Sequence, residues 1–340
     1  MPRPQISFAT CNLYNLNEPG RPIYFDRDGL SEEEYSKKLV WLSRVLTHHS
    51  ADIWGFQELW HGDSLQNAFA MSGLDEEYSL LVPYDHTGGR IVCGGAVKKK
   101  MLVGEPEWID EFPEHFKLDS KGDDAQTPDI SVQVNKFSRP VLHFKVKPRQ
   151  DQPAIHIYVC HFKSKKPTSI RSENWYKKSM YSRHQAALGN AISTIRRTAE
   201  SAALRMILTE RLKKTDTPVI VMGDLNDSQH SNTLNILTDQ PNYLLSHSSR
   251  GGSDSGLYSV GTLQEYRSLR DVYYTHVYKN TRESLDHILV SQEFYDNSRK
   301  RIWAFKGMDI LNDHLNDENH KETGTTDHGI VRARFEFNPA

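Results

Sequence analysis

The sequence is poor in cysteine, and its three cysteines do not have the spacing of a metal site. Cys11, Cys93 and Cys160 lie far apart, with no CxxC pair among them. This spacing argues against a structural zinc site and against a disulfide framework. Two of the three stand in apolar, strand-like runs. We therefore predict buried free thiols and a reducing compartment.

Long hydrophobic runs are also missing. No run approaches the roughly 18 apolar residues that cross a bilayer. The first residues, "MPRPQISFATCNLYNLN", lack the uninterrupted apolar segment of a signal peptide. We expect a cytoplasmic protein without stable membrane association, or a secreted one if a leader has been removed.

Neither sign of charge is in large excess. The 340 residues include 42 basic and 44 acidic ones, for a formal net charge of −2. The balance gives no global electrostatic reason to bind nucleic acid, so a polyanion site has to be a local basic patch. Nothing in the sequence indicates a protein partner, and we expect a monomer.

Strands and helices interleave along the whole chain. Helices are predicted over 31–49, where Ser31 and Glu34 form a capping box, from about Asp63, and over 172–214, where Gly189 is a candidate break. Residues 119–129 read as an exposed polar loop. Strands are predicted at 6–13, 52–59, 78–82, 90–98, 139–146, 154–160, 217–224, 283–291, 301–305 and 325–337. With no linker or repeat, the pattern favours one α/β domain over 1–340 with mixed sheets.

Polar side chains stand where many of these strands end. The stretch "PVIVMGDLND" (218–227) shows the pattern, and taken alone it fits a solvated turn as well as the floor of an active site. Loops at one rim of a sheet can converge on a single site. The side chains at strand ends are Asn12, Glu58, His161, Asp224, Asn226, Asp286, Asp327 and His328.

This set contains hard oxygen ligands and no thiolate. It suits Mg²⁺, with Mn²⁺ or Ca²⁺ as alternatives, better than structural zinc. The sequence has no GxxxxGK[ST] loop, no GxSxG elbow and no HExxH motif. Carboxylates, amides and histidines around a hard cation point to phosphoryl chemistry, in which an acid–base pair activates water and protonates a leaving group.

Six short motifs then point to a family. In order, "CN", "FQEL", "HFKSK", "MGDLND", "SLDHILVS" and "TTDHGIV" resemble the endonuclease/exonuclease/phosphatase superfamily, whose members include deoxyribonuclease-like phosphohydrolases. Each motif is weak alone, but all six in this order, from residue 12 to residue 328, are specific. The resemblance implies a four-layer α/β sandwich of two mixed sheets packed face to face and flanked by helices.

The resemblance also implies a metal site. Glu58 matches the principal metal ligand, Asn12 matches a residue that helps to hold the metal or the scissile phosphate, and Asp327 would be a carboxylate on the metal side. The implied cofactor is Mg²⁺, with Mn²⁺ or Ca²⁺ as alternatives.

Catalytic roles are implied for five further residues. Asp224 and Asn226 would orient the attacking water and bind phosphate oxygens. His328 would contact the phosphate and transfer a proton, with its imidazole oriented by Asp286. His161 resembles the second histidine of the deoxyribonuclease and phosphatase branches. The implied function is a metal-dependent phosphodiesterase, specifically a nuclease acting on nucleic acid.

One departure and two alternatives bear on that function. Abasic-site endonucleases usually have an acidic residue where this chain has Tyr14, so that branch is disfavoured. The first alternative keeps the chemistry but takes a phosphoinositide, a sphingomyelin-like lipid or a small phosphate ester as substrate. The second is a catalytically silent binding protein; against it, the chain retains the whole metal and His/Asp set.

Basic and aromatic residues near the motifs have competing interpretations. Lys163 would contact the phosphate or belong to a solvated loop, and Arg139 would face the phosphate or form an ion pair. A salt-bridged helix surface is predicted for Arg196, Arg197, Glu200 and Arg205. Core packing is favoured over base stacking for Trp175, Tyr176 and Tyr181. Strand alternation turns His287 to the face opposite Asp286.

Overall fold

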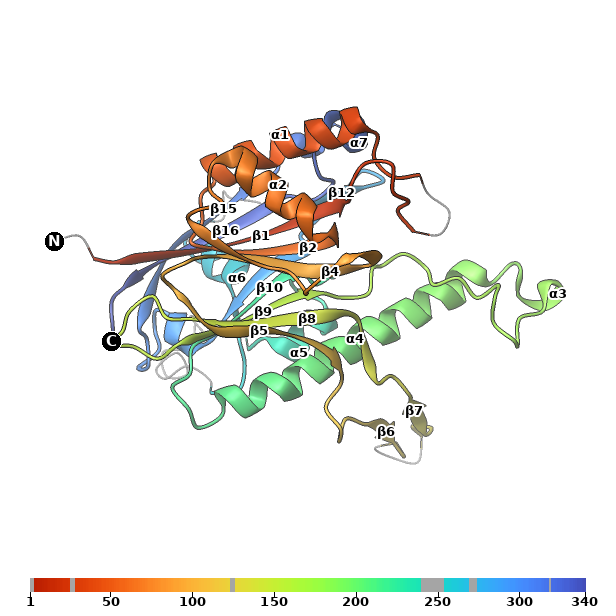
Figure 1. Cartoon of the computed structure of the whole chain (residues 1–340). Coiled ribbons are helices and arrows are strands. Elements are labelled where there is room, and N and C mark those ends of the chain that lie inside the picture. Colours follow the sequence, from red (N-terminus) through yellow and green to blue (C-terminus); the bar gives the residue numbers. More distant parts are fainter. Residues whose placement is uncertain (1–2, 25–27, 123–125, 240–253, 269–273, 318) are drawn as a thin grey trace.

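Two six-stranded mixed sheets form the centre of the part of the chain that the structure describes (Figure 1). The structure is a computed structural model, and it describes residues 3–24, 28–122, 126–239, 254–268, 274–317 and 319–340. The first sheet has the order β15-β16-β1-β2-β4-β3. Its strands are β1 (Gln5–Leu16), β2 (Ile53–His61), β3 (Tyr78–Leu81), β4 (Thr87–Lys98), β15 (Trp303–Leu311) and β16 (Ile330–Phe337).

The second sheet has the order β11-β14-β10-β9-β8-β5. In each sheet one central pair is parallel, β1 with β2 and β9 with β10, and the other pairs are antiparallel. The strands are β5 (Leu102–Glu111), β8 (Lys136–Val146), β9 (Ile155–His161), β10 (Val219–Asp224), β11 (Tyr258–Ser259) and β14 (Asp286–Val290). Two hairpins lie outside both sheets: β6 (Leu118–Ser120) with β7 (Ile130–Val132), and β12 (His276–Tyr278) with β13 (Thr281–Glu283).

Helices cover the outer faces of the sheets (Figure 1). α1 (Glu32–His48) and α2 (Gly62–Ser72) lie on the first sheet, and α4 (Gln185–Leu212) and α5 (Asn232–Leu237) lie on the second. The short helices are α3 (Lys178–Tyr181), α6 (Val260–Glu265), α7 (His320–Thr323) and the 3₁₀ turns η1 (Gln292–Phe294) and η2 (Asp313–Asn316). None of the described helices combines the length and the apolar character needed to cross a bilayer.

Strand alternation builds the layers. Phe8 of β1 and Met222 of β10 belong to the apolar cluster between the sheets, whereas Cys11, on the other face of β1, packs with Leu42 of α1. A third cluster joins α4 to the outer face of the second sheet. The four-layer α/β sandwich is therefore confirmed, and so are the three buried free cysteines.

Local signals predicted α1 well but failed at Gly189. Both hydrogen bonds of the Ser31–Glu34 capping box are present. α4, however, runs unbroken through Gly189 and begins only at Gln185, so the helix predicted over 172–214 is wrong over 172–184 except for α3. Gly189 is needed for close approach instead, because a Cβ there would lie 2.4 Å from the carbonyl oxygen of Thr168.

Some strands also differ from the prediction. The strand β5 was not predicted, because it is an edge strand that contains a proline and none of its residues is buried. The run 283–291 divides into β13 and β14, and 325–337 becomes a strand only at Ile330. The predicted polar loop 119–129 includes the end of β6, and its residues 123–125 lie outside the described residues.

The predicted salt-bridged surface of α4 is wrong. Within the described residues Arg196 and Arg205 form no salt bridge. Arg205 donates instead to the carbonyls of Ile236 and Leu237. Arg197 and Glu200 are buried. Arg197 Nε binds Asp227, and the Glu200 carboxylate accepts hydrogen bonds at 2.7 Å from the backbone N–H groups of Ser138 and Lys163. A buried carboxylate is tolerated when hydrogen bonds satisfy it, and here it fixes the loop that follows β9 to the helix.

Candidate active site

The polar ends of the central strands meet at one end of the two sheets. In the second sheet Asp224 pairs in register with His161 on one side and with Asp286 on the other. In the first sheet Asn12 is the last residue of β1 that pairs with β2 before the register shifts. Asn12 Nδ2 donates to Asp224 Oδ2 at 3.2 Å, so a hydrogen bond joins the polar ends of the two sheets.

Asp224 is the centre of the cluster. Its Oδ2 lies 3.4 Å from His161 Nε2 and 3.9 Å from His328 Nε2, and its Oδ1 accepts a 2.9 Å hydrogen bond from the backbone N–H of Asn226. Burial raises the pKa of Asp224 to about 7, although the charge of His328 lowers it. This carboxyl group therefore changes charge near neutral pH.

Unusual backbone conformations aim these side chains. Gly223 has φ +143°, and a Cβ there would lie 2.0 Å from the carbonyl oxygen of Cys160, so only glycine fits beside β9. Asn226 (φ +54°) and Glu58 (φ +60°) adopt the left-handed conformation without being glycine. The register of β2 against β4 shifts between Phe56 and Leu59, and such a bulge re-aims the side chain it contains.

Glu58 extends the cluster towards β1. Its Oε2 accepts a 3.0 Å hydrogen bond from the backbone N–H of Asn15, and its Oε1 lies 3.9 Å from His161 Nε2. Burial raises the pKa of Glu58, and the negative charge of Asp327 raises it further. Glu58 and Asp327 are thus two carboxylates whose charges oppose each other in this site.

The two predicted histidines have opposite protonation tendencies. Burial lowers the pKa of His328, but the charges of Asp286 and Asp224 outweigh it and raise the pKa well above its ordinary value. His328 Nδ1 lies 2.8 Å from Asp286 Oδ2. Burial, together with Arg139, lowers the pKa of His161 well below its ordinary value. Near neutral pH the site therefore pairs an imidazolium with a neutral imidazole.

The other predicted residues are placed less uniformly. The Nδ2 of Asn226 and a guanidinium nitrogen of Arg139 both donate to the Phe162 carbonyl, at 3.0 and 3.2 Å. These two side chains therefore do not hydrogen-bond to the carboxylate of Asp224. The amine of Lys163 donates to Ser164 and to the Lys166 carbonyl and does not join the cluster. His287 is buried on the other face of β14, as alternation predicts, with Nε2 2.9 Å from the Asp227 carbonyl oxygen.

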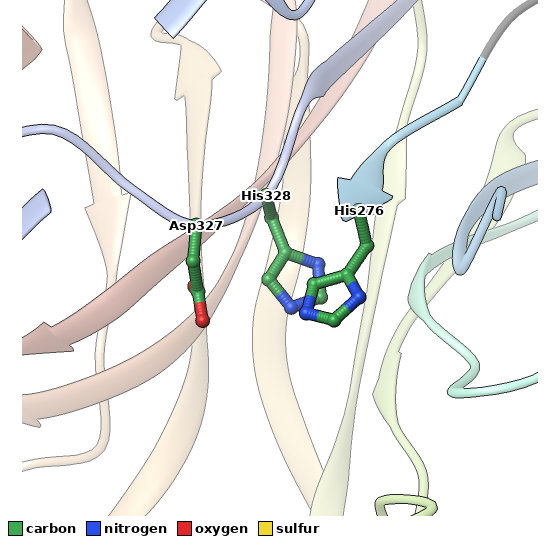
Figure 2. Close-up of side chains that lie close together, drawn as sticks. All are labelled: His276, Asp327 and His328. Carbon is green, nitrogen blue, oxygen red and sulfur yellow. The ribbon is translucent and has the colours of Figure 1, made fainter. Parts of the chain in front are cut away.

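Two residues at the site were not predicted from the sequence. The first is His276 of β12, which has its ring centroid 4.9 Å from that of His328, and Figure 2 shows it beside His328 and Asp327. Ligand atoms of these three side chains lie within 4.8 Å of one another. No motif marks the segment "YTHVY", so a lone histidine was its only signal.

Lys38 of α1 is the second of these residues. It is buried, and its Nζ donates to the Thr325 carbonyl at 3.2 Å. Burial lowers the pKa of Lys38 to about 8, while the charges of Asp327 and Glu58 raise it. Its spacing was a usable signal, because residue 38 shares a helix face with the buried Tyr35 and Leu42.

The donor set fits a hard divalent cation. Among the described residues, no lysine or arginine lies within 4 Å of the carboxylates of Glu58, Asp224 or Asp286. Asp286 Oδ1 is buried without a hydrogen-bond partner, and ligand atoms of Asp224, Asp286 and His328 lie within 4.8 Å of one another. The imidazolium of His328 offsets only part of the charge of these three carboxylates, and a divalent cation would offset the rest.

Solved structures of known proteins share this fold. Truncated TDP2 from Caenorhabditis elegans is 11% identical, with a TM-score of 0.55 and 98% of each chain covered. An endonuclease/exonuclease/phosphatase from Bacteroides vulgatus is 16% identical, with a TM-score of 0.54, covering 99% of this chain and 100% of that one. The human Nocturnin catalytic domain with bound sulfate is 15% identical, with a TM-score of 0.53, covering 99% and 96%.

The family model gives the most direct result. A comparison with curated proteins finds no match. The model of the Endonuclease/Exonuclease/phosphatase family matches residues 9–328, which is most of the chain and includes every residue of the cluster. The chain therefore belongs to the Endonuclease/Exonuclease/phosphatase family, whose members are in general hydrolytic phosphoesterases.

Proposed function

We propose that the protein is a divalent-metal-dependent phosphodiesterase that hydrolyses nucleic acid by in-line attack of water on phosphorus. The observation that carries the proposal is the position of Asp224. One buried carboxylate oxygen faces an amide donor from the other sheet and the Nε2 atoms of two histidines with opposite protonation tendencies. A base, an acid and a neutral donor around one small space suit phosphoryl transfer.

In this proposal Glu58, Asp327 and Asn12 hold Mg²⁺, or Mn²⁺ or Ca²⁺ in its place. The bound cation would offset charge on the phosphoryl oxygens as the transition state forms. Asn12 can serve although its Oδ1 already accepts the backbone N–H of Tyr14 at 3.0 Å, because an amide oxygen has two lone pairs.

Asp224 is proposed to orient the attacking water and take its proton. Its pKa of about 7 suits a general base that works near neutral pH. Asn12 and the backbone of Asn226 fix both oxygens of the carboxylate, which limits its motion before the water arrives.

His328 is proposed to protonate the leaving oxygen from Nε2. Asp286 accepts from Nδ1, which fixes the tautomer and keeps the imidazolium form populated. The neutral His161 would donate a hydrogen bond from Nε2 to a phosphate oxygen. In the step itself, a water oxygen bonds to phosphorus, the phosphorus–oxygen bond to the leaving group breaks, and the leaving oxygen receives the proton of His328.

A substrate panel tests the proposal. Purified protein is offered plasmid DNA, RNA, bis-p-nitrophenyl phosphate and p-nitrophenyl phosphate with Mg²⁺, Mn²⁺ or Ca²⁺. We expect the diester to be cleaved faster than the monoester and a chelator to abolish turnover. Asp224→Ala and His328→Ala should each lower kcat by about 10²–10⁴-fold, with the fold checked by circular dichroism.

Two results would contradict the proposal. Turnover of the monoester alone would refute a nuclease and leave a phosphatase. Unchanged turnover in either variant would refute the assigned chemistry.

A further inference from the structure

Residues 162–184, which link β9 to α4, form a basic extension beside the candidate site. The extension begins at the residue after His161, so it starts where the strand reaches the site. Figure 1 shows the segment around α3 reaching well past the ends of the strands of both sheets. A substrate longer than one phosphodiester would pass over this segment as it enters or leaves the site.

The extension has a charge that the rest of the molecule lacks. It contains seven lysine and arginine residues against one glutamate, Glu173, whereas the whole chain has 42 basic and 44 acidic residues. Within the described residues six of its seven cations form no salt bridge, and five of these six are exposed: Lys166, Arg171, Lys177, Lys178 and Arg183. These side chains are exposed, so their charge is directed at solvent or at a partner.

Aromatic rings lie among these cations. The core packing predicted for this group is wrong, because Trp175 is 47% exposed. Its ring meets Tyr181 edge to face at 5.2 Å, and the Tyr176 hydroxyl accepts a 2.6 Å hydrogen bond from Gln185. The extension therefore holds an exposed indole on a supporting ring instead of burying it.

The base of the extension is firmly attached. Ile170 is buried, and the Thr168 backbone N–H donates to the Gly189 carbonyl on α4 at 3.1 Å. Arg197 of α4 donates to the Lys163 carbonyl at 3.2 Å. A segment attached in this way presents its side chains at a fixed position relative to His161.

Other exposed aromatic rings border the same end of the sheets. Tyr84 is 99% exposed and lies just before β4, which begins where β2 ends beside the site. Tyr278 is 62% exposed, at the turn after His276. Exposed aromatic rings beside solvated cations are the arrangement with which proteins bind the bases and phosphates of single strands.

We propose that the basic extension binds single-stranded nucleic acid and delivers its phosphodiester to the candidate site, an inference that rests on the proposed function. Trp175 stacks on an unpaired base, and Lys177 and Lys178 neutralise phosphates next to it. Duplex DNA offers no free base on which the indole of Trp175 could stack, because its bases are already stacked and paired.

A lipid surface fits the same segment less well. Interfacial helices insert a continuous apolar face, and the helix in the extension, α3, has four residues with none of them buried. The exposed large apolar side chains of the extension are Trp175 and Met180, and the sequence around them is rich in lysine and arginine. Nucleic acid can use both the exposed indole and the cations, because its bases stack and its phosphates are negatively charged.

Binding without turnover tests the proposal. The probe is a fluorescein-labelled oligothymidylate of roughly 12 nucleotides with phosphorothioate linkages, titrated with full-length protein in EDTA and followed by anisotropy. Trp175→Ala should weaken binding by about fivefold or more with little change in salt dependence, and Trp175→Phe should restore most of it. Lys177→Ser/Lys178→Ser should weaken binding and lower the slope of log K against log salt by about 1.4.

Matched controls distinguish binding by the extension from a general effect of positive charge on the protein surface. Lys213→Ser/Lys214→Ser removes two exposed lysines without a salt bridge among the described residues, at the end of α4 away from the extension, and should bind like the unmodified protein. Binding to a duplex of equal length should be weaker than to the single strand.

Three results would overturn the proposal: equal losses in both lysine pairs, a duplex preference, or extension variants that lose binding to phosphatidylglycerol vesicles but not to the oligonucleotide. The proposed function fails separately, if the unmodified protein with metal does not cleave bis-p-nitrophenyl phosphate.

Discussion

At the scale of single residues, Asp286 acts on the proposed reaction only through His328. Its Oδ2 lies 2.8 Å from His328 Nδ1, and its charge raises the pKa of that imidazole against the effect of burial. We expect Asp286→Asn to lower kcat by about 10²–10⁴-fold on the small diester. The pKa of His328 should fall when the negative charge of Asp286 is removed. The loss of activity at alkaline pH should therefore begin at a lower pH in the variant than in the unmodified protein.

A pH profile of kcat/KM for bis-p-nitrophenyl phosphate measures both effects. Asp309→Asn is the matched control, because Asp309 of β15 is an aspartate paired with Arg332 and Arg334 of β16. An alkaline limb that stays in place in Asp286→Asn would contradict the assignment of His328 as the acid.

Residues of the cluster differ in how visible they were in the sequence. Glu58, Asp224 and His328 stand in short motifs at strand ends, so their types and order identified them. His276 stands in no motif, and the only signal for Lys38 was its position on the apolar face of an amphipathic helix. Both lie at the site only because α1 and β12 pack against the segment that carries Asp327 and His328.

At the scale of elements, Gly223 determines whether β10 can lie beside β9. Its φ is +143°, and a Cβ added to it would lie 2.0 Å from the Cys160 carbonyl oxygen, so a side chain here combines strain with a clash that the backbone has to relieve. We expect Gly223→Ala to lower the free energy of unfolding by about 3 kcal/mol or more. Urea denaturation monitored by tryptophan fluorescence measures the loss.

Gly73→Ala is the control for this strain. Gly73 ends α2 with φ +71°, and a Cβ there would meet nothing within 4 Å. Its loss should be only about 1–2 kcal/mol, the cost of the left-handed conformation alone. Equal losses in the two variants would show that the clash with Cys160 contributes nothing.

Glu293 gives the connection between β14 and β15 a pH dependence. It is buried, it accepts the Ser291 hydroxyl, and burial raises its pKa to about 7. Since the folded pKa lies above the unfolded value of about 4.3, the folded state keeps a proton that the unfolded state has released. Stability should therefore be fully present below pH 4 and should fall as the pH rises to 7.

We expect Glu293→Gln to remove this part of the pH profile. Unfolding midpoints at pH 5 and pH 8 should differ less in the variant than in the unmodified protein, by an amount equivalent to about 2–3 kcal/mol. Parallel profiles for the two proteins would show that Glu293 ionises normally in the folded state.

At the scale of the whole molecule, we expect the opposed carboxylates of Glu58 and Asp327 to link metal binding to stability. Magnesium at about 100 times its dissociation constant should stabilise the fold by about 2.7 kcal/mol. In Glu58→Gln we expect most of this gain to disappear, because the amide keeps the acceptor for Asn15 but loses the charge. Thermal unfolding with and without magnesium measures the gain.

Two comparisons make that result specific. Without metal, Glu58→Gln should be at least as stable as the unmodified protein, since burial disfavours the charge of Glu58. Glu336→Gln, at the other end of β16, should keep the full magnesium effect. An equal magnesium effect in Glu58→Gln would exclude Glu58 as a ligand.

The sequence alone determined the alternation of strands and helices, the capping of α1, the family and the residue types of the candidate site. It could do so because periodicity, capping and motif order depend on residues that are near one another in the chain. The tertiary structure alone decided which face of α4 is buried, where β5 forms an edge, and that Trp175 meets solvent. It also decided that Lys38 and His276 lie beside the segment that carries Asp327 and His328, because only packed sheets and helices fix distances between residues far apart in the chain.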